Sequence, residues 1–183
     1  MAGSLQDVYL DELSALYDGE MQIVLALPRL AEAARGTALR EALFRHADES
    51  RLHLERLDLI FTHWGTTPRP HRCAGVTGIV QEADERLHEA QTVEARDAAI
   101  LGAAHKVEHY EIAAYGCVGT LARRLNRTDE ARLLQETLNE KWRADRLFAT
   151  IADAGLAEPA APQPVEFTLP TGGFGPVLPA GRS

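Results

Sequence analysis

Apolar residues recur along this chain at steps of three and four residues, which is the spacing of amphipathic helices. The first such pattern covers residues 5–34, where Ser4 is a suitable N-cap and Gly36 a suitable stop. Pro28 lies inside this stretch and is expected to kink the helix, because proline removes one backbone hydrogen bond. The apolar positions of this pattern are Val8, Leu13, Leu16, Tyr17, Val24 and Leu27.

Three further long patterns follow the first one. They predict helices over residues 37–64, 93–125 and 128–154. The segment Gly65–Gly78 is rich in turn-forming residues and is predicted to be a connection, followed by a short helix over residues 79–90. No strand is expected. Two antiparallel helical hairpins joined by a long crossover have the connectivity of an all-α, ferritin-like four-helix bundle. We expect this bundle to occupy residues 1–154.

The last part of the chain, residues 155–183, is rich in proline and glycine and has no helical period. It is predicted to be an extended tail. Its scattered apolar side chains leave two interpretations open. The tail either packs on a neighbouring subunit or is a functionally silent end.

Composition narrows the classes of function. The 183 residues, with 45% hydrophobic and 25% charged side chains, are typical of one globular domain, and a net charge of -8 disfavours a nucleic-acid partner. No stretch is apolar enough to span a membrane, and the N-terminal residues lack the pattern of a signal or transit peptide. Two cysteines, Cys73 and Cys117, are too few for a disulfide framework. The cytoplasm is therefore the expected compartment.

Two matched pairs of glutamates indicate the chemistry. Glu20 and Glu49 are 29 residues apart, as are Glu111 and Glu140, and each is expected on the core-facing stripe of its helix. Buried ionised carboxylates are very costly without a counter-charge. A pair of divalent metal ions would supply that charge, as in ferritin-like carboxylate proteins. A lone glutamate of this kind is more often solvated, so the prediction depends on the four together.

Further candidate ligands lie on the same predicted faces. Glu108 shares a face with Glu111, and His46 and His53 flank Glu49 on their helix. The Glu-x-x-His pattern of di-iron proteins is matched only in part, so the nitrogen ligand is left open between His46 and His53. Such a carboxylate-rich set favours iron or manganese over zinc.

Other polar residues near the predicted site have ordinary explanations. Asp145 is expected to be a surface group or a hydrogen-bond partner of a ligand, and Tyr17 and Tyr115 are expected to be core residues that lie near the carboxylates. The loop residues His63, His71 and Cys73 have spacings that only weakly resemble a zinc site. No nucleophile with a base and no phosphate-binding glycine loop is present.

Five strings, in order, carry a resemblance to a known family: LDELSALYDGEMQ, LPRLAEAA, HADESRLHLERL, AAHKVEHYEIAAYG and LLQETLNEKWRAD. Over about residues 5–154 the chain resembles the bacterial YciF-like family of stress-associated, ferritin-like proteins. The resemblance implies a four-helix bundle with a dinuclear metal site, and a homodimer. It places metal ligands at Glu20, Glu49, Glu108, Glu111 and Glu140. The chain departs from the family pattern at Gly19, where alanine is usual, at His53, where glutamine is common, and at Lys141, where a further acid is usual.

The leading hypothesis of function is an oxidoreductase or ferroxidase that protects against stress. Two iron or manganese ions would react with oxygen or peroxide, with Glu49 and Glu140 bridging them and Glu20 and Glu111 terminal, an assignment that rests on the resemblance. His53 and Glu108 complete the predicted set of metal ligands. Two alternatives stay open: a non-catalytic metal-binding scaffold or sequestration protein, and a manganese catalase-like dismutation of peroxide.

Overall fold

The computed structural model describes residues 3–155, which form five α-helices and no strand. The helices are α1 (Leu5–Ala33), α2 (Thr37–His63), α3 (Ala74–Glu89), α4 (Val93–Arg124) and α5 (Thr128–Asp153). The four long helices agree with the predicted ones to within one residue at each end. Helix α1 continues through Pro28 without ending there. Apart from Gly155, the predicted tail lies outside the described residues.

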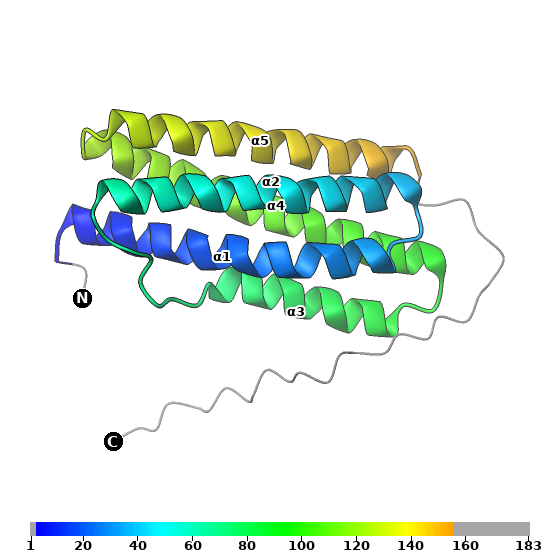
Figure 1. Ribbon diagram of the computed structural model, residues 1–183. Coiled ribbons are helices and arrows are strands. Elements are labelled where there is room, and N and C mark those ends of the chain that lie inside the picture. The colour runs from blue at the N-terminus through cyan, green and yellow to red at the C-terminus, as the bar shows by residue number, and fades with distance from the viewer. Residues whose placement is uncertain (1–2, 156–183) are drawn as a thin grey trace, which may run out of the picture.

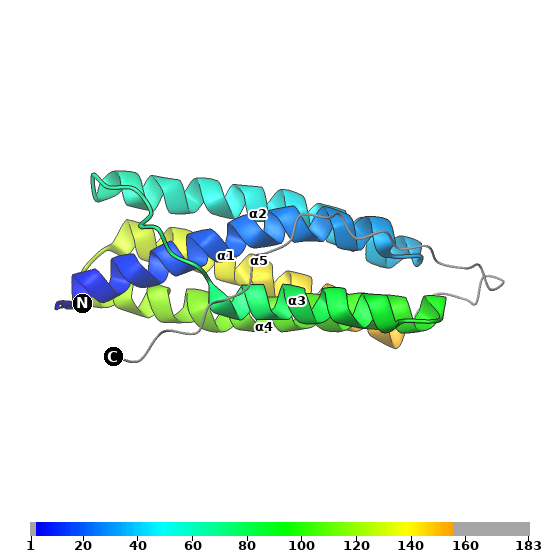
Figure 2. The same cartoon turned by 90° about the horizontal axis from the view of Figure 1, so that it is seen from below.

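The four long helices form a ring of antiparallel neighbours (Figure 1). Helix α1 packs on α2 and helix α4 packs on α5, and the two hairpins meet through contacts of α1 with α4 and of α2 with α5. The shorter α3 lies outside this ring, against α4 and α1, at the end of the crossover from α2 (Figure 2). The predicted all-α bundle with a long crossover and a short extra helix is therefore confirmed.

The start of α1 and the turn between α1 and α2 are each fixed by side-chain hydrogen bonds to the backbone. The Ser4 side chain accepts from the backbone N–H of Asp7, and the Asp7 carboxylate accepts in return from the backbone N–H of Ser4, a reciprocal capping box. At the turn between α1 and α2, the carboxylate of Asp97 accepts from the backbone N–H groups of Arg35 (2.9 Å) and Gly36 (2.7 Å). Gly36 is the N-cap of α2. Helix α4 thereby holds the turn of the first hairpin.

The start of α3 differs from the predicted one. The helix begins at Ala74, not at residue 79, because Gly75 and Gly78 are helical and do not form a turn. A Cβ atom on Gly75 would lie 2.4 Å from the ring of Tyr110, so this glycine permits close packing of α3 on α4. The carboxylate of Asp18 accepts from the backbone N–H of Cys73 (2.7 Å) and anchors the start of α3 to α1.

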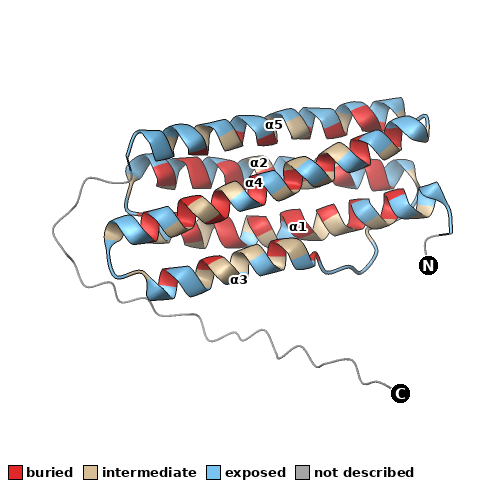
Figure 3. Cartoon of the chain, turned by 180° about the vertical axis from the view of Figure 1, so that it is seen from behind, coloured by how far each residue is buried: buried red, intermediate tan, exposed pale blue. Residues whose placement is uncertain are grey.

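Two apolar clusters fill the bundle and leave a polar layer between them. Buried residues lie on the inward faces of all four long helices (Figure 3). One cluster includes Ile23, Leu27, Leu43, Ile100, Val107 and Phe148, and the other includes Leu13, Leu16, Leu57, Ile60, Tyr115 and Leu134. Along each helix the sequence passes from one cluster to the other through buried polar side chains. None of the helices described here has the length and apolar character that crossing a bilayer requires.

Candidate metal centre

The polar layer contains buried groups from all four long helices. Its members are Glu20 of α1, His46, Ser50 and His53 of α2, Glu108 and Glu111 of α4, and Thr137 and Lys141 of α5. Four of the predicted ligands, Glu20, His53, Glu108 and Glu111, are therefore together in the core. Such a concentration of buried ionisable groups is rare unless their charges are matched.

Lys141 lies at the centre of this layer and is fully buried, with 0% of its surface exposed. Its ammonium donates to Oε2 of Glu111 at 2.6 Å and forms an ion pair with Oε1 of Glu20 at 3.0 Å. Burial disfavours the charged form, but the two carboxylates outweigh it and raise the pKa of Lys141 above its usual range. The layer thus contains its own permanent cation, which the sequence analysis did not assign.

On one side of Lys141 the hydrogen bonds are well formed. Oε1 of Glu20 accepts from the hydroxyl of Tyr115 (2.8 Å) and lies 3.0 Å from Nδ1 of His53. Burial raises the pKa of Glu20, but Lys141 and His53 outweigh it and hold that pKa below its usual range. The other ring nitrogen of His53 lies 3.0 Å from Glu140. Lys141, Tyr115, His53 and Glu140 are thus linked through Glu20 and His53, although the second oxygen of Glu20 has no partner.

On the other side of Lys141, three side chains face one another without proper hydrogen bonds. His46, Glu108 and Glu111, called here the His46 cluster, each offer one ligand atom, and these atoms lie within 4.8 Å of one another. Nε2 of His46 and Oε1 of Glu108 are 2.7 Å apart but are not aligned for a hydrogen bond. The second oxygen of Glu108 and Oε1 of Glu111 also have no partner. Buried polar atoms of this kind need a partner, which an ordered water or a bound ion would supply.

The ionisation of the His46 cluster reflects its burial. Burial alone would lower the pKa of His46, but the nearby carboxylate of Glu108 outweighs it and raises the pKa to about 9. Burial, and then the negative charge of Glu20, raise the pKa of Glu111 well above its usual range. Without a bound ion the imidazole of His46 therefore retains its proton near neutral pH, and the carboxyl group of Glu111 holds a proton more strongly than a free one does.

A surface pocket of about 270 Å³ reaches this cluster between α2 and α5. His46 forms part of its wall, and Glu49 stands at its edge with its side chain 37% exposed and Oε2 3.9 Å from Nδ1 of His46. Arg45 and Arg143 also line the pocket. The pocket gives small molecules and ions a path to the His46 cluster.

Glu49 and Glu140 lie at the edge of the layer, contrary to their expected place in the core. Glu140 is 20% exposed and binds the guanidinium of Arg56 through both carboxylate oxygens. Successive residues of a helix differ by about 100° in direction, so with Lys141 inside the bundle Glu140 points to its edge. The equal 29-residue intervals therefore do not reflect four equivalent positions.

Comparisons with known proteins agree with this architecture. Residues 4–161 match the family described as a domain of unknown function, DUF892. The chain is 37% identical over 150 residues to protein YciF of Escherichia coli K12, covering 81% of this chain and 90% of YciF. The crystal structure of the E. coli stress protein YciF superposes with a TM-score of 0.80 at 36% identity, over 82% of this chain and 96% of that one. The YcfI structure from Rhodopseudomonas palustris gives 0.78 at 37% identity, over 80% and 94%.

Proposed function

Since the chain belongs to the YciF-like DUF892 family, whose E. coli member is described as a stress protein, we propose that it is a metal-binding protein with a modified ferritin-like centre. The His46 cluster binds one divalent cation, and the ammonium of Lys141 takes the place of a second cation. The observation that carries this proposal is the set of buried nitrogen and oxygen atoms of His46, Glu108 and Glu111 that face one another without hydrogen-bond partners.

The balance of charge in the polar layer supports one ion. Glu20, Glu108 and Glu111, all ionised, carry three negative charges, and Lys141 supplies one positive charge. A divalent cation at the His46 cluster supplies the remaining two, while the charge of Glu140 is matched by Arg56 outside the cluster. The layer is then neutral, which is the condition for burying so many charged groups.

A second ion does not fit the same layer. One oxygen of Glu20 and one of Glu111 are held by Lys141, at 3.0 and 2.6 Å, so the ammonium occupies the space between these two carboxylates. This favours a single ion over the pair expected from the sequence, and it disfavours a manganese catalase-like reaction, which the sequence analysis based on a pair of ions.

The donor set favours iron(II) or manganese(II). Two carboxylates and one imidazole are hard and borderline ligands, and among the described residues the cluster includes no thiolate. A bound iron or manganese ion would supply one-electron redox chemistry. Glu108 and Glu111 would hold its charge, and His46 would supply the nitrogen ligand. Holding or sequestering such an ion is the function that the geometry supports best.

Reaction of the bound ion with oxygen or peroxide is a second candidate, and one observation favours it. The 270 Å³ pocket reaches His46, so a small oxidant has access to the His46 cluster from solvent. Under this candidate Glu49 stands at the pocket edge, where its carboxylate contacts entering cations. The protein would then act as a ferroxidase or oxidoreductase with one ion per chain.

The test is a titration of chelator-treated protein with Mn²⁺ under anaerobic conditions, with free Mn²⁺ followed by electron paramagnetic resonance. We expect one tightly bound ion that is lost in His46→Ala and Glu108→Gln, since both changes remove a ligand. Glu82→Gln, which changes a surface carboxylate on α3, is the matched control and should bind as the wild type does. Unchanged Mn²⁺ binding in both ligand variants would overturn the proposal. Two ions lost together in His46→Ala would instead restore the dinuclear interpretation.

The second candidate is tested by adding oxygen or peroxide to the iron(II)-loaded protein. Oxidation of the bound iron that is faster than that of free iron(II), and that slows in a Glu49→Gln variant with normal metal affinity, supports a redox function. Bound iron(II) that is oxidised no faster than free iron(II) supports sequestration.

A further inference from the structure

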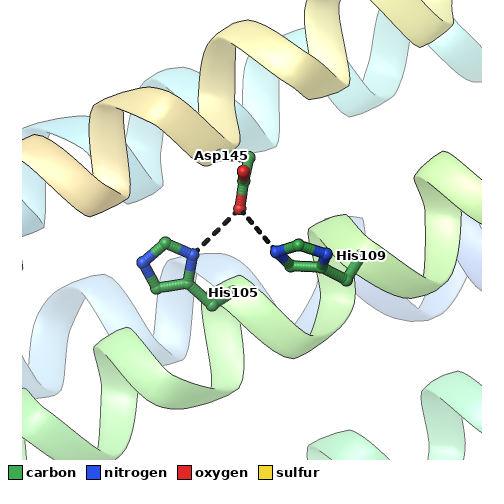
Figure 4. Close-up of side chains that lie close together, drawn as sticks. All are labelled: His105, His109 and Asp145. Atoms are coloured by element: carbon green, nitrogen blue, oxygen red, sulfur yellow. Dashed lines mark hydrogen bonds and ion pairs between the residues drawn. The ribbon is translucent and has the colours of Figure 1, made fainter.

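A second group of potential metal ligands lies on the outside of the bundle. His105 and His109 are one helical turn apart on α4, so both rings stand on the same face, and Asp145 of α5 approaches them across the contact between these two helices (Figure 4). We call these three residues the His105 cluster. It shares no residue with the polar layer in the core.

The distances within the His105 cluster are short and convergent. Oδ1 of Asp145 lies 2.9 Å from Nδ1 of His105 and 3.2 Å from Nε2 of His109. A single carboxylate oxygen thus lies against both rings, as the two dashed lines in Figure 4 show. One ligand atom from each residue can be chosen so that all three lie within 4.8 Å of one another.

These separations are close to those around a bound metal ion. With metal–nitrogen bonds of about 2.0–2.1 Å, two ligands of a tetrahedral zinc ion are about 3.3 Å apart. The observed 2.9 and 3.2 Å separations therefore require shifts of only a few tenths of an ångström. The two ring nitrogens, which lie within 4.8 Å of each other, would come to the same separation as the rings turn towards an ion. Helices α4 and α5 pack against each other, and their backbones supply the rigidity that such a site needs.

We propose that His105, His109 and Asp145 bind a divalent first-row transition ion, with Zn²⁺ as the typical occupant. Two imidazoles and one carboxylate form the three-ligand set of open zinc sites, in which water or another molecule completes the coordination. Mg²⁺ and Ca²⁺ prefer oxygen ligands throughout and are not expected to bind. The exposure of His109, 64% for its side chain, leaves the open position facing solvent.

The surface site is separate from the buried centre but near it. The ring of Phe148 packs edge-on against His105, with ring centres 6.2 Å apart, and against His46, with ring centres 6.1 Å apart. One phenyl ring therefore stands between an imidazole of each cluster. Because the ligand sets differ, each site can be removed without changing a ligand of the other.

The experiment is calorimetric titration of the chelator-treated full chain with Zn²⁺, repeated with Co²⁺, whose visible absorption reports nitrogen and oxygen ligands. His109→Ala and Asp145→Asn each remove a ligand and should weaken Zn²⁺ binding at this site at least 10–100-fold. Mutating a residue that only hydrogen-bonds to a metal ligand typically already lowers metal affinity by that factor. His88→Ala, at a single exposed histidine of α3, is the control and should bind as the wild type does. Circular dichroism checks that each variant is folded.

The variants also separate this proposal from the buried centre. His46→Ala should retain Zn²⁺ binding that His109→Ala loses, and this result would support the surface site whether or not the buried ion exists. Zn²⁺ binding that is unchanged in both His109→Ala and Asp145→Asn would overturn the proposal. Binding that is lost only in His46→Ala would overturn it too, because the ion would then belong to the core.

Discussion

Replacing Lys141 by methionine tests the account of the buried layer most directly. The change removes the ammonium but keeps most of the volume of the side chain, so Glu20 and Glu111 lose their common cation without a large cavity. Glu20 keeps its contacts with Tyr115 and His53, but a buried carboxylate that loses its cation takes up a proton instead of staying charged. The ordinary pKa of a glutamate is 4.5. At about 1.4 kcal/mol per pH unit, protonating Glu20 at pH 7 therefore costs about 3.4 kcal/mol.

The expected loss in the free energy of unfolding at pH 7 is therefore about 3–5 kcal/mol, which is the range for breaking a buried ion pair. For a protein of this size it lowers the melting temperature by roughly 10 °C. The measurement is thermal and urea denaturation followed by circular dichroism, with chelator present so that no metal compensates. Lys106→Met is the control, because Lys106 is exposed and its pair with Glu82 is worth at most about 1 kcal/mol.

The pH dependence gives this prediction a second readout. In the wild type the pKa of Glu20 is held low, so its contribution is present above pH 4.5 and is lost as the pH falls through the folded-state value. In Lys141→Met the folded state binds the proton, so the penalty is largest at high pH. The difference between the two proteins should shrink by about 1.4 kcal/mol per unit from pH 7 to pH 4.5. A loss below 1 kcal/mol at pH 7, or one that is constant with pH, would refute the reasoning.

Three other predictions follow from the same structure. Lys141→Glu exchanges the buried cation for a ligand and should raise the Mn²⁺ held in the core from one ion to two, counted by electron paramagnetic resonance; an unchanged count contradicts the role given to the ammonium. Binding of one divalent ion near pH 7 should release about one proton, from the imidazole of His46, measured by calorimetry in buffers of different ionisation enthalpy; no release contradicts the role of His46 as a ligand. Glu130→Ala should cost about 2–4 kcal/mol in urea denaturation, because the buried Tyr9 hydroxyl (2.9 Å) and the Trp64 ring N–H (3.0 Å) lose their acceptor; a loss below 1 kcal/mol contradicts it.

The fold could be predicted from the sequence because its signals are local. Apolar spacing marks each long helix, and a serine and a glycine mark two of the ends: Ser4 caps α1, and Gly65, with a φ of +62°, follows α2. The start of α3 was missed because Gly75 resembles a turn residue in sequence. Glycine is required at position 75 by the ring of Tyr110, which lies on another helix and 35 positions further along the chain.

The candidate site could be predicted only in part, because burial of a charged residue depends on partners from other helices. The sequence places Glu20, Glu108 and Glu111 on inward faces, and the structure buries them. It gives no local sign that Lys141, and not Glu140, faces inward, since a lysine on a helix is usually solvent-exposed. The only sign in the sequence was the resemblance, in which position 141 is usually an acidic residue and is lysine in this chain.

The two proposed sites should differ in metal preference because their surroundings differ. The His46 cluster is buried, is reached through a pocket between α2 and α5, is rich in oxygen ligands and lies beside a fixed positive charge, so it should bind more slowly and favour iron or manganese. The His105 cluster is open, has two nitrogen ligands and faces solvent, so it should exchange ions quickly and favour zinc. With one equivalent each of Mn²⁺ and Zn²⁺, the protein should hold both ions, since neither site is the preferred place for the other's metal. If Zn²⁺ displaced Mn²⁺ from a His109→Ala variant, the core would be a zinc site, and the argument from its carboxylates would fail.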